Sequence, residues 1–477
     1  MQLHFIANTP QPGSSGDTIP VIDPSDGQVF DHLQRGNAAD IDRAVQAARH
    51  GYDTAWSKLN AAERGRLLMR LSNKLVEHEA ELTALEQRDC GKPTRQARAD
   101  AVAIARYFEF YAGACDKLHG ETIPFLDGYS VLTWREPHGV TGHVIPWNYP
   151  MQIYGRSVGG ALAAGNVCVV KPAEDACLSL LRVAQLAAEC GFPAGTINVV
   201  TGYGHEAGDA LARHPGIDHI SFTGSPRVGT LIQQVAAERH CPVTLELGGK
   251  SPQVVFADAD LDAAVPAILN GIVQNAGQTC SAGSRVLIEQ AIYEPMLERL
   301  GDAFSRLRVG PAAMDLDAGP LIRASQQQRV WDFLSDAQYA NIPVVAQGQI
   351  VDEAPDSGYY QAPTLLRDVP VDHRLAQEEV FGPVLAAMPF SGEDDAATRA
   401  NATAFGLAAG VWTRDGGRQL RMARRIRSGQ VFINNYGAAG GVELPFGGVK
   451  SSGYGREKGL EALIGFTTLK TVAIRHG

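Results

Sequence analysis

Long apolar runs and basic patches are both missing from this 477-residue chain. No window approaches the ~20 consecutive apolar residues that span a bilayer. The start, MQLHFIANTPQPGSSGD, lacks the basic region and apolar run of a secretory signal. The 42 basic residues are outnumbered by 52 acidic ones, spread without a block of one sign, whereas nucleic-acid binders carry a basic patch. We therefore expect a cytoplasmic protein that binds neither membrane nor nucleic acid.

The cysteines are few and scattered. There are seven, and none forms a C-x-x-C pair, so the sequence indicates neither a disulfide framework nor a zinc site, and we predict no metal. Cys280 stands apart, because its segment NAGQTCSAGSR (275–285) surrounds it with small and amide-bearing residues. A buried structural cysteine usually has bulky apolar neighbours. By its surroundings alone, Cys280 is either a nucleophile or a small filler residue.

Apolar periodicity divides the chain into regions. With 45% hydrophobic and 20% charged residues, this is an ordinary globular composition, and the length predicts two or three domains. Residues 38–116 place apolar side chains at helical spacing. From about residue 130, short apolar runs alternate with helical stretches, which predicts a parallel sheet covered on both faces. The predicted strands are 142–146, 166–172, 196–202 and 219–225.

Unusual residues follow each of these predicted strands. They are Pro146-Trp147-Asn148, Lys171-Pro172-Ala173-Glu174, Thr201-Gly202-Tyr203-Gly204 and Phe222-Thr223-Gly224-Ser225. Ligands of parallel sheets bind beyond the carboxyl ends of the strands. The G-x-G-x-x-G pattern is missing after the first strand, but Gly224 and Gly229 open a helix whose amides could meet a diphosphate. Together these strand ends predict a dinucleotide site.

A second alternating region covers about residues 250–450, with strands predicted at 253–258, 285–289, 383–390 and 409–413. Cys280 lies in the connection before the second of these strands. The sequence therefore predicts a cofactor domain, a second domain that holds the thiol, and a cleft between them.

The order of seven motifs resembles that of the aldehyde dehydrogenase superfamily over nearly the whole chain. The motifs are PWNYP, KPAE, FTGS, LELGGKSP, GQTC, EEVFGPV and PFGGVKSSGYGREKG. The resemblance implies an α/β fold with two doubly wound, Rossmann-like domains and a small β arm used in a homodimer or homotetramer. The implied boundaries are 1–118 and 138–249 for the NAD-binding domain, 250–449 for the catalytic domain, and 119–137 with 465–477 for the arm.

The same resemblance assigns three catalytic positions. Cys280 matches the nucleophile that forms a thiohemiacetal and then a thioester, which requires either a lowered thiol pKa or a nearby base. Glu246 matches the general base that activates water; otherwise it is a solvated or capping glutamate at a strand end. Asn148 matches the oxyanion donor; otherwise it shapes the turn before Pro150.

Further matches concern the cofactor. Lys171 and Glu174 match contacts to the adenosine ribose, and a carboxylate there repels a 2′-phosphate, so NAD is expected. Some members with this glutamate use both cofactors, so NADP stays open. Glu379 and Phe381 match contacts to the nicotinamide end, although Phe381 is equally compatible with core packing. The remaining predicted cofactor contacts are Ile145, Trp147, Gly224, Ser225, Gly229 and Leu247.

The substrate side is less defined. Tyr149, Ile153 and Arg156 fall on the family's tunnel positions, and residues 434–448 are expected to form the opposite wall. An arginine at the third position resembles members that act on semialdehydes or other polar aldehydes. Alternatively, Arg156 points to solvent or pairs with an acid of a neighbouring chain.

Three other functions compete with an acid-forming aldehyde dehydrogenase. A coenzyme A-acylating relative typically lacks the glutamate that stands here at position 246. A binding or structural protein on the same fold would not need Cys280, Glu246 and Asn148 together. A cofactor-free cysteine hydrolase lacks an obvious histidine partner and leaves the polar strand ends unexplained.

Overall fold

One large sheet holds the predicted strands of the first region. The computed structural model describes residues 1–477 apart from the side chain of Ala439. The parallel part of the sheet has the order β9-β8-β7-β10-β11. The order reverses between the neighbours β7 and β10, so their carboxyl ends form the switch point at which such sheets bind ligands. The strands are β7 (Val140–Ile145), β8 (Val167–Pro172), β9 (Ile197–Val199), β10 (His219–Thr223) and β11 (Val243–Glu246).

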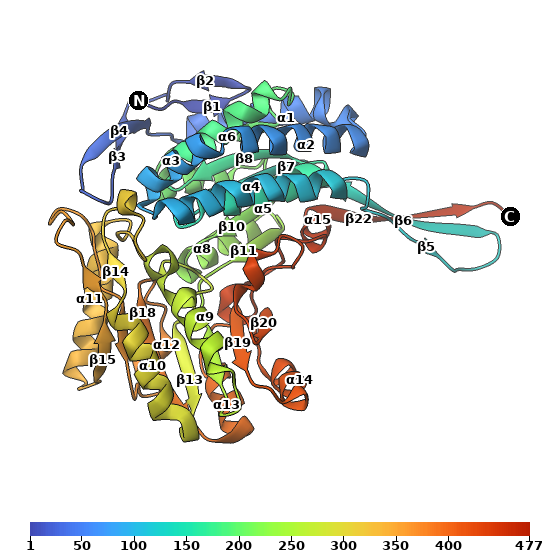
Figure 1. Ribbon diagram of the computed structural model, residues 1–477. Coiled ribbons are helices and arrows are strands. Elements are labelled where there is room, and N and C mark those ends of the chain that lie inside the picture. The colour runs from blue at the N-terminus through green and yellow to red at the C-terminus, as the bar shows by residue number, and fades with distance from the viewer.

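Helices cover both faces of this sheet (Figure 1). The predicted helical region 38–116 divides into several helices, because capping boxes start two of them, at Asn37 with Asp40 and at Asn60 with Glu63. Between β9 and β10, where the alternating pattern predicts a helical stretch, the chain forms a π turn (Gly204–Gly208) followed by the short α7 (Asp209–Arg213). The other helices are α1 (Ala38–Thr54), α2 (Ala61–Glu77), α3 (Glu79–Cys90), α4 (Thr94–Ala114), α5 (Pro150–Ala164), α6 (Leu178–Glu189) and α8 (Pro226–Ala237).

A second sheet lies below the first in Figure 1. Its order is β15-β17-β18-β13-β12-β19-β20, parallel from β17 to β20, with β15 antiparallel at the edge. The strands are β12 (Pro252–Val255), β13 (Arg285–Glu289), β15 (Val344–Gln347), β17 (Thr364–Leu366), β18 (Val384–Phe390), β19 (Ala408–Trp412) and β20 (Gln430–Ile433). The helices of this half include α9 (Leu261–Val273), α10 (Tyr293–Ser305), α11 (Ala324–Tyr339), α13 (Gly392–Asn401) and α14 (Gly416–Arg425). The predicted two-sheet α/β fold is confirmed.

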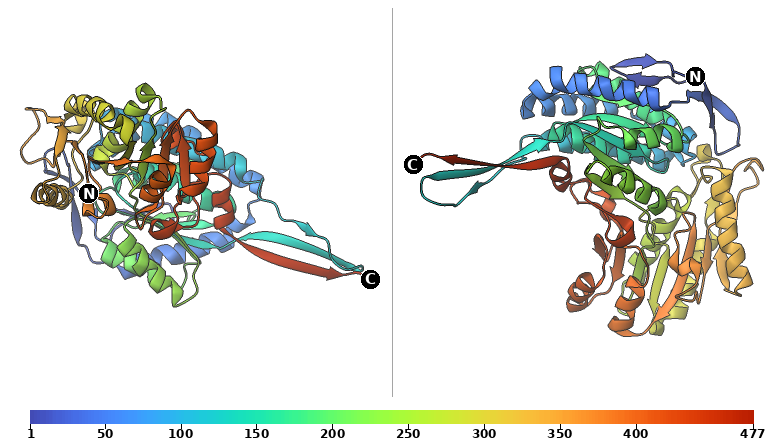
Figure 2. Two further views of the ribbon diagram at one scale, coloured as in Figure 1. Left: turned by 90° about the horizontal axis from the view of Figure 1, so that it is seen from below. Right: turned by 180° about the vertical axis from the view of Figure 1, so that it is seen from behind.

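A long β ribbon projects from the body and carries the C-terminus at its tip (Figures 1 and 2). Its strands pair antiparallel in the order β22-β6-β5. They are β5 (Thr122–Ile123), β6 (Tyr129–Pro137) and β22 (Thr467–Arg475). Both segments predicted to form the arm therefore meet in one small sheet. Large apolar side chains are exposed along it, at Ile123, Phe125, Leu126, Trp134 and Leu469.

Other pairings at the ends of the chain were not predicted. Strand β1 (His4–Ile6) extends the first sheet by pairing with β9, while β3 (Thr18–Ile22) and β4 (Val29–Gln34) form a hairpin. Strand β21 (Gly453–Tyr454) pairs with β11, so the chain returns to the first sheet after residue 449. These segments are short, and short strands carry little periodicity. The predicted domain boundaries stay a prediction.

Among the residues described, no helix is both long and apolar enough to cross a membrane.

Candidate active site

A left-handed turn presents Cys280. Three successive residues have positive φ: Asn275 at 49°, Ala276 at 51° and Gly277 at 74°. A Cβ at position 277 would lie 2.2 Å from the carbonyl carbon of Gly382, so glycine is required there. This turn ends the path of α9 and redirects the chain toward the first sheet.

Hydrogen bonds from the other sheet hold this turn in place. Asn275 Nδ2 donates to the carbonyl oxygen of Asn148 at 2.8 Å and to that of Gln278 at 3.3 Å. Asn148 Nδ2 donates to the Gln278 carbonyl at 3.0 Å. Gln278 is fully buried, and its Oε1 accepts from the backbone N–H of Ile322 at 2.9 Å. The loop carrying Cys280 is thus fixed to the carboxyl end of β7.

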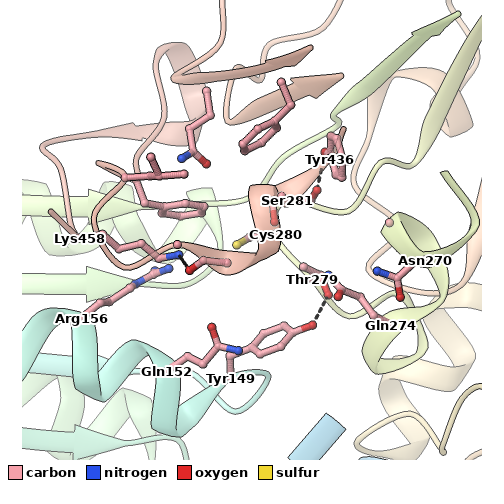
Figure 3. Close-up of a pocket in the computed structure, with 18 of the residues that line it drawn as sticks. Tyr149, Gln152, Arg156, Asn270, Gln274, Thr279, Cys280, Ser281, Tyr436 and Lys458 are labelled. Atoms are coloured by element: carbon pink, nitrogen blue, oxygen red, sulfur yellow. Dashed lines mark hydrogen bonds between the residues drawn. The ribbon is translucent and has the colours of Figure 1, made fainter. Parts of the chain in front are cut away.

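Cys280 lines two cavities, one on each side of the loop. One, of about 410 Å³, is shown in Figure 3; Tyr149, Ile153 and Arg156 line it, and we call it the substrate-side cavity. The other, of about 550 Å³, opens along the carboxyl ends of β7 and β10, and we call it the nucleotide-side cavity. The sulfur is therefore accessible from both.

Glu246 ends β11 and lines the nucleotide-side cavity together with Cys280. Its side chain is only 2% exposed, and neither carboxylate oxygen has a hydrogen-bond partner among the described residues. A solvated glutamate would be exposed and a capping glutamate would accept from backbone N–H groups, so neither alternative fits. A buried carboxyl aimed at a cavity is available to a water or a reacting atom.

Asn148 also lines the nucleotide-side cavity beside Cys280. Its side chain bonds to Gln278, 130 residues away in the sequence, and not to the turn before Pro150. The amide nitrogen carries two hydrogens, and the bond to Gln278 fixes the direction of the second. The turn-shaping alternative therefore does not describe this side chain.

Burial disfavours the charged form of both reactive groups. It raises the pKa of the Cys280 thiol to about 11, against an opposing effect of the Arg156 cation. Burial, followed by the charge of Glu457, raises the pKa of Glu246 well above its ordinary value. The thiol pKa is therefore not lowered. Formation of the thiolate then requires the other route, in which a nearby base accepts the thiol proton.

The structure brings most predicted cofactor residues to the nucleotide-side cavity. Trp147, Gly224, Ser225, Glu379 and Phe381 line it. The Phe381 ring meets the edge of Trp147 at a centroid distance of 5.3 Å, so it belongs to the cavity wall and not to a core. Glu379 Oε1 accepts from the Gly249 N–H at 2.8 Å, and burial raises its pKa to about 7.

Three other predicted cofactor residues, Ile145, Lys171 and Glu174, lie at or just after the ends of β7 and β8. Lys171 Nζ is 3.1 Å from Glu174 Oε2, just beyond β8. The Ile145 carbonyl accepts from the Ala173 N–H at 2.7 Å, which joins the ends of β7 and β8. The side chains of Ile145, Lys171 and Glu174 do not border the nucleotide-side cavity itself.

The two glycines near the start of α8 use their own amides within the protein. The Gly224 N–H donates to the Glu246 carbonyl at 3.0 Å, and the Gly229 N–H donates to the Ser225 carbonyl at 2.9 Å. These two amides are therefore used within the protein, and the predicted contact between a diphosphate and other amides at the start of this helix stays a prediction. Gly229 instead allows α8 to approach Leu247, since a Cβ there would lie 2.6 Å from Leu247 Cδ2. Ser225, Pro226 and Arg227 are the helix-start residues that line the cavity.

The model of the aldehyde dehydrogenase family matches residues 11–472. The chain belongs to the aldehyde dehydrogenase family.

Solved and curated relatives agree over almost the whole length of this family member. A Burkholderia cenocepacia protein, provisionally assigned as an aldehyde dehydrogenase, has a crystal structure with 71% identity and a TM-score of 0.99, and all of both chains is covered. The NAD-dependent aldehyde dehydrogenase of Sinorhizobium meliloti has 37% identity and a TM-score of 0.97, covering 100% of this chain and 95% of that one. Hydroxyisobutyraldehyde dehydrogenase of Mycolicibacterium austroafricanum is 43% identical over 467 residues, which are 97% of this chain and 92% of the relative.

In this aldehyde dehydrogenase, Arg156 lies in the wall of the substrate-side cavity but is engaged by its own chain. Its guanidinium pairs with the carboxylate of Glu457, and both side chains are almost fully buried. It also stacks over the Phe446 ring, 4.7 Å from the centroid. Arg156 therefore neither points to solvent nor needs an acid of a neighbouring chain, so both alternatives are wrong.

Several lining residues of the substrate-side cavity were not predicted individually. Tyr436, Gly437, Gly440, Gly441, Leu444 and Phe446 come from the wall expected at 434–448. Others were not among the predicted substrate residues: Gln152, Asn270, Gln274 and Phe432 belong to no motif, whereas Thr279 lies in GQTC and Lys458 in PFGGVKSSGYGREKG. On the nucleotide side, Arg323, Gln326 and Arg329 at the start of α11 were also missed. No local sequence spacing marks either set as part of a site, because tertiary packing alone brings these residues to the cavities.

The raised thiol pKa predicts how the alkylation rate of Cys280 depends on pH. Below pH 11 the thiolate fraction rises about tenfold per pH unit, because the thiolate is the minor form there. We expect the rate of Cys280 alkylation by iodoacetamide, measured by mass spectrometry without cofactor, to increase about tenfold from pH 7 to 8 and again from 8 to 9. A rate that stays constant from pH 6 to 9 would show instead a thiol already ionised.

Asn275 and Ala276 form a matched pair for testing the turn. Asn275→Gly keeps the left-handed backbone accessible but removes both amide hydrogen bonds, and losing a buried hydrogen bond costs about 1–3 kcal/mol. We expect the kcat for aldehyde oxidation to fall about tenfold or more in Asn275→Gly. Ala276→Gly removes no hydrogen bond and is expected to stay near the wild-type rate. Equal rates for the two variants would show that the amide of Asn275 does not position the site.

Proposed function

We propose that this chain oxidises an aldehyde to the carboxylic acid with NAD, through a covalent bond to Cys280. The observation that carries this proposal is the position of one sulfur at the junction of two cavities. An aldehyde in the substrate-side cavity and a nicotinamide in the nucleotide-side cavity would both reach the same atom. Asn148 and Glu246 border the second cavity at that point.

The first step uses groups already in place. The Cys280 sulfur attacks the aldehyde carbon, and its proton passes through Glu246 or a neighbouring water to solvent, which leaves the Glu246 carboxylate free for the later step. The carbonyl oxygen becomes an alkoxide, which the second N–H of the Asn148 amide and the backbone N–H of Cys280 stabilise. Donors of this kind contribute about 3–4 kcal/mol each to the transition state.

The second half-reaction releases the acid. Bound NAD supplies the acceptor for the hydride of the thiohemiacetal, which leaves a thioester on Cys280. Glu246 then takes a proton from water, the water oxygen adds to the acyl carbon, and the carbon–sulfur bond breaks to give the acid and the thiol. A carboxyl of raised pKa suits this work, because its proton affinity approaches that required near neutral pH.

The preference for NAD rests on Lys171 and Glu174. The ion pair between them holds the Glu174 carboxylate just beyond β8, where a 2′-phosphate would be repelled. The Sinorhizobium meliloti relative is an NAD-dependent enzyme, in line with this proposal. NADP is expected to require higher concentrations than NAD.

The competing functions are less compatible with the site. A coenzyme A-acylating enzyme has no use for a buried glutamate beside the reactive sulfur, whereas here Glu246 lines the same cavity as Cys280. A cysteine hydrolase would not need the nucleotide-side cavity, and a purely structural protein would not need an accessible sulfur. The substrate we propose is a polar aldehyde, since Gln152, Asn270, Gln274 and Thr279 line the substrate-side cavity.

Glu246→Gln separates hydride transfer from hydrolysis. It keeps the size of the side chain but removes the base, a change that costs about 10²–10⁴-fold in rate. We expect a burst of about one reduced nicotinamide per active site, followed by steady-state turnover at least about 100-fold slower than wild type.

Cys280→Ala is the control for this experiment, and no burst is expected from it. A wild-type rate in Glu246→Gln would contradict hydrolysis through this carboxylate. Formation of an acyl-coenzyme A when coenzyme A is added to the wild type would favour the acylating alternative.

We also propose that the arm joins copies of this chain into a homodimer or homotetramer. An isolated ribbon with exposed apolar side chains is marginally stable in water unless something covers it. Light scattering is expected to give a mass of two or four times the 51.0 kDa of one chain. Trp134→Glu, which places a charge on the exposed arm, is expected to shift this mass toward the monomer. A wild-type monomer would contradict the proposal.

A further inference from the structure

The charges in the substrate-side cavity do not balance. Arg156 and Glu457 form a buried ion pair, so their charges cancel. Lys458 also lines the cavity, and only 9% of it is exposed. Figure 3 shows its amino group beside the Arg156 guanidinium, on the side of the cavity where the Cys280 sulfur lies.

Lys458 has only weak partners for its charge. Its Nζ donates to the Gly440 carbonyl at 3.2 Å and lies 5.4 Å and 5.8 Å from the ring centroids of Phe446 and Tyr107. No carboxylate of the described residues lies within ion-pair distance of it. Burying an ammonium without a counter-ion is unfavourable, so proteins seldom retain one without use for it.

The nearby acids do not supply the missing charge. Glu457 is taken by Arg156, and Glu246 lines the nucleotide-side cavity and not this one. Burial, followed by the charge of Arg156, lowers the pKa of Lys458 to about 8, which keeps most of the population charged at pH 7. The cavity beside Cys280 therefore carries a net positive charge.

The backbone at this position is also unusual. Lys458 has φ of 61°, a left-handed conformation in which glycine or asparagine is the ordinary choice. A lysine there is strained, and strained non-glycine residues cluster at ligand sites. The strain and the charge imbalance thus occur at the same residue.

We propose that Lys458 binds a carboxylate carried by the aldehyde, which makes semialdehydes of dicarboxylic acids the preferred substrate class. This inference rests on the proposed oxidation of aldehydes at Cys280. It assigns the recognition of the acidic group to Lys458 and not to Arg156, whose guanidinium is occupied by Glu457. A ligand carboxylate would give Lys458 a charge-assisted hydrogen bond that the protein itself does not provide.

A single ammonium favours a singly charged group. An aldehyde bearing a quaternary ammonium would be repelled, and a neutral aldehyde would leave Lys458 without a counter-ion. The cavity of about 410 Å³ also has apolar walls, at Ile153, Leu444 and Phe446, which suit a short methylene chain between the two ends of a semialdehyde.

The test compares aldehydes that differ only in the distal group. The full-length enzyme with NAD is given 4-oxobutanoate and butanal, 5-oxopentanoate and pentanal, and a trimethylammonium aldehyde. We expect kcat/KM to be highest for the two oxo acids and lowest for the cation. In Lys458→Met, KM for the oxo acids should rise tenfold or more, with a much smaller change for the neutral aldehydes.

Two further variants serve as controls. Lys458→Arg keeps the charge and should restore most of the preference for oxo acids, whereas Lys74→Met removes a partly exposed lysine on α2 and should change neither class. Equal losses for acidic and neutral aldehydes in Lys458→Met would overturn the role of Lys458. A wild type that prefers butanal to 4-oxobutanoate would overturn the substrate class. If the wild type reduced NAD with none of the aldehydes, the proposed function itself would fail.

Discussion

The position of the Cys280 sulfur depends on three consecutive left-handed residues held by hydrogen bonds from the other sheet. The turn at 275–277 would be unfavourable on its own, since Asn275 and Ala276 both carry a Cβ. The bonds from Asn275 and Asn148 to the Gln278 carbonyl offset that cost and tie the turn to the end of β7. Each sheet thus supplies half of the site: one provides the sulfur, and the other provides the amide that faces it.

Parallel strands explain why polar residues from distant segments meet here. All strands of a parallel sheet point their carboxyl ends the same way, so Asn148 after β7, Ser225 after β10 and Glu246 at the end of β11 border one cavity. Burial then determines their chemistry. It raises the pKa of both the Cys280 thiol and the Glu246 carboxyl, because a desolvated site disfavours negative charge.

The substrate-side cavity follows a different electrostatic rule. Arg156 is matched by Glu457, but Lys458, the very next residue after Glu457, has no such acid among the described residues. The Arg156 cation is therefore structural, and the Lys458 cation is available to a ligand. Glu457 and Lys458 are adjacent in the sequence but act differently. The Glu457 side chain pairs with Arg156 on α5, whereas the Lys458 side chain lines the cavity.

The sequence by itself determined the two alternating α/β regions, the strand ends that carry polar residues, and the motif set that identifies the family. These features are local: apolar periodicity follows from strand and helix geometry, and motif residues keep their spacing in the chain. Only the tertiary structure decided that the Gly224 and Gly229 amides are already bonded, that Arg156 is neutralised by Glu457, and that Lys458 faces the sulfur. Such outcomes depend on which partner lies across the fold. Charges and hydrogen bonds are satisfied in space, by residues hundreds of positions away, and no local pattern records that choice.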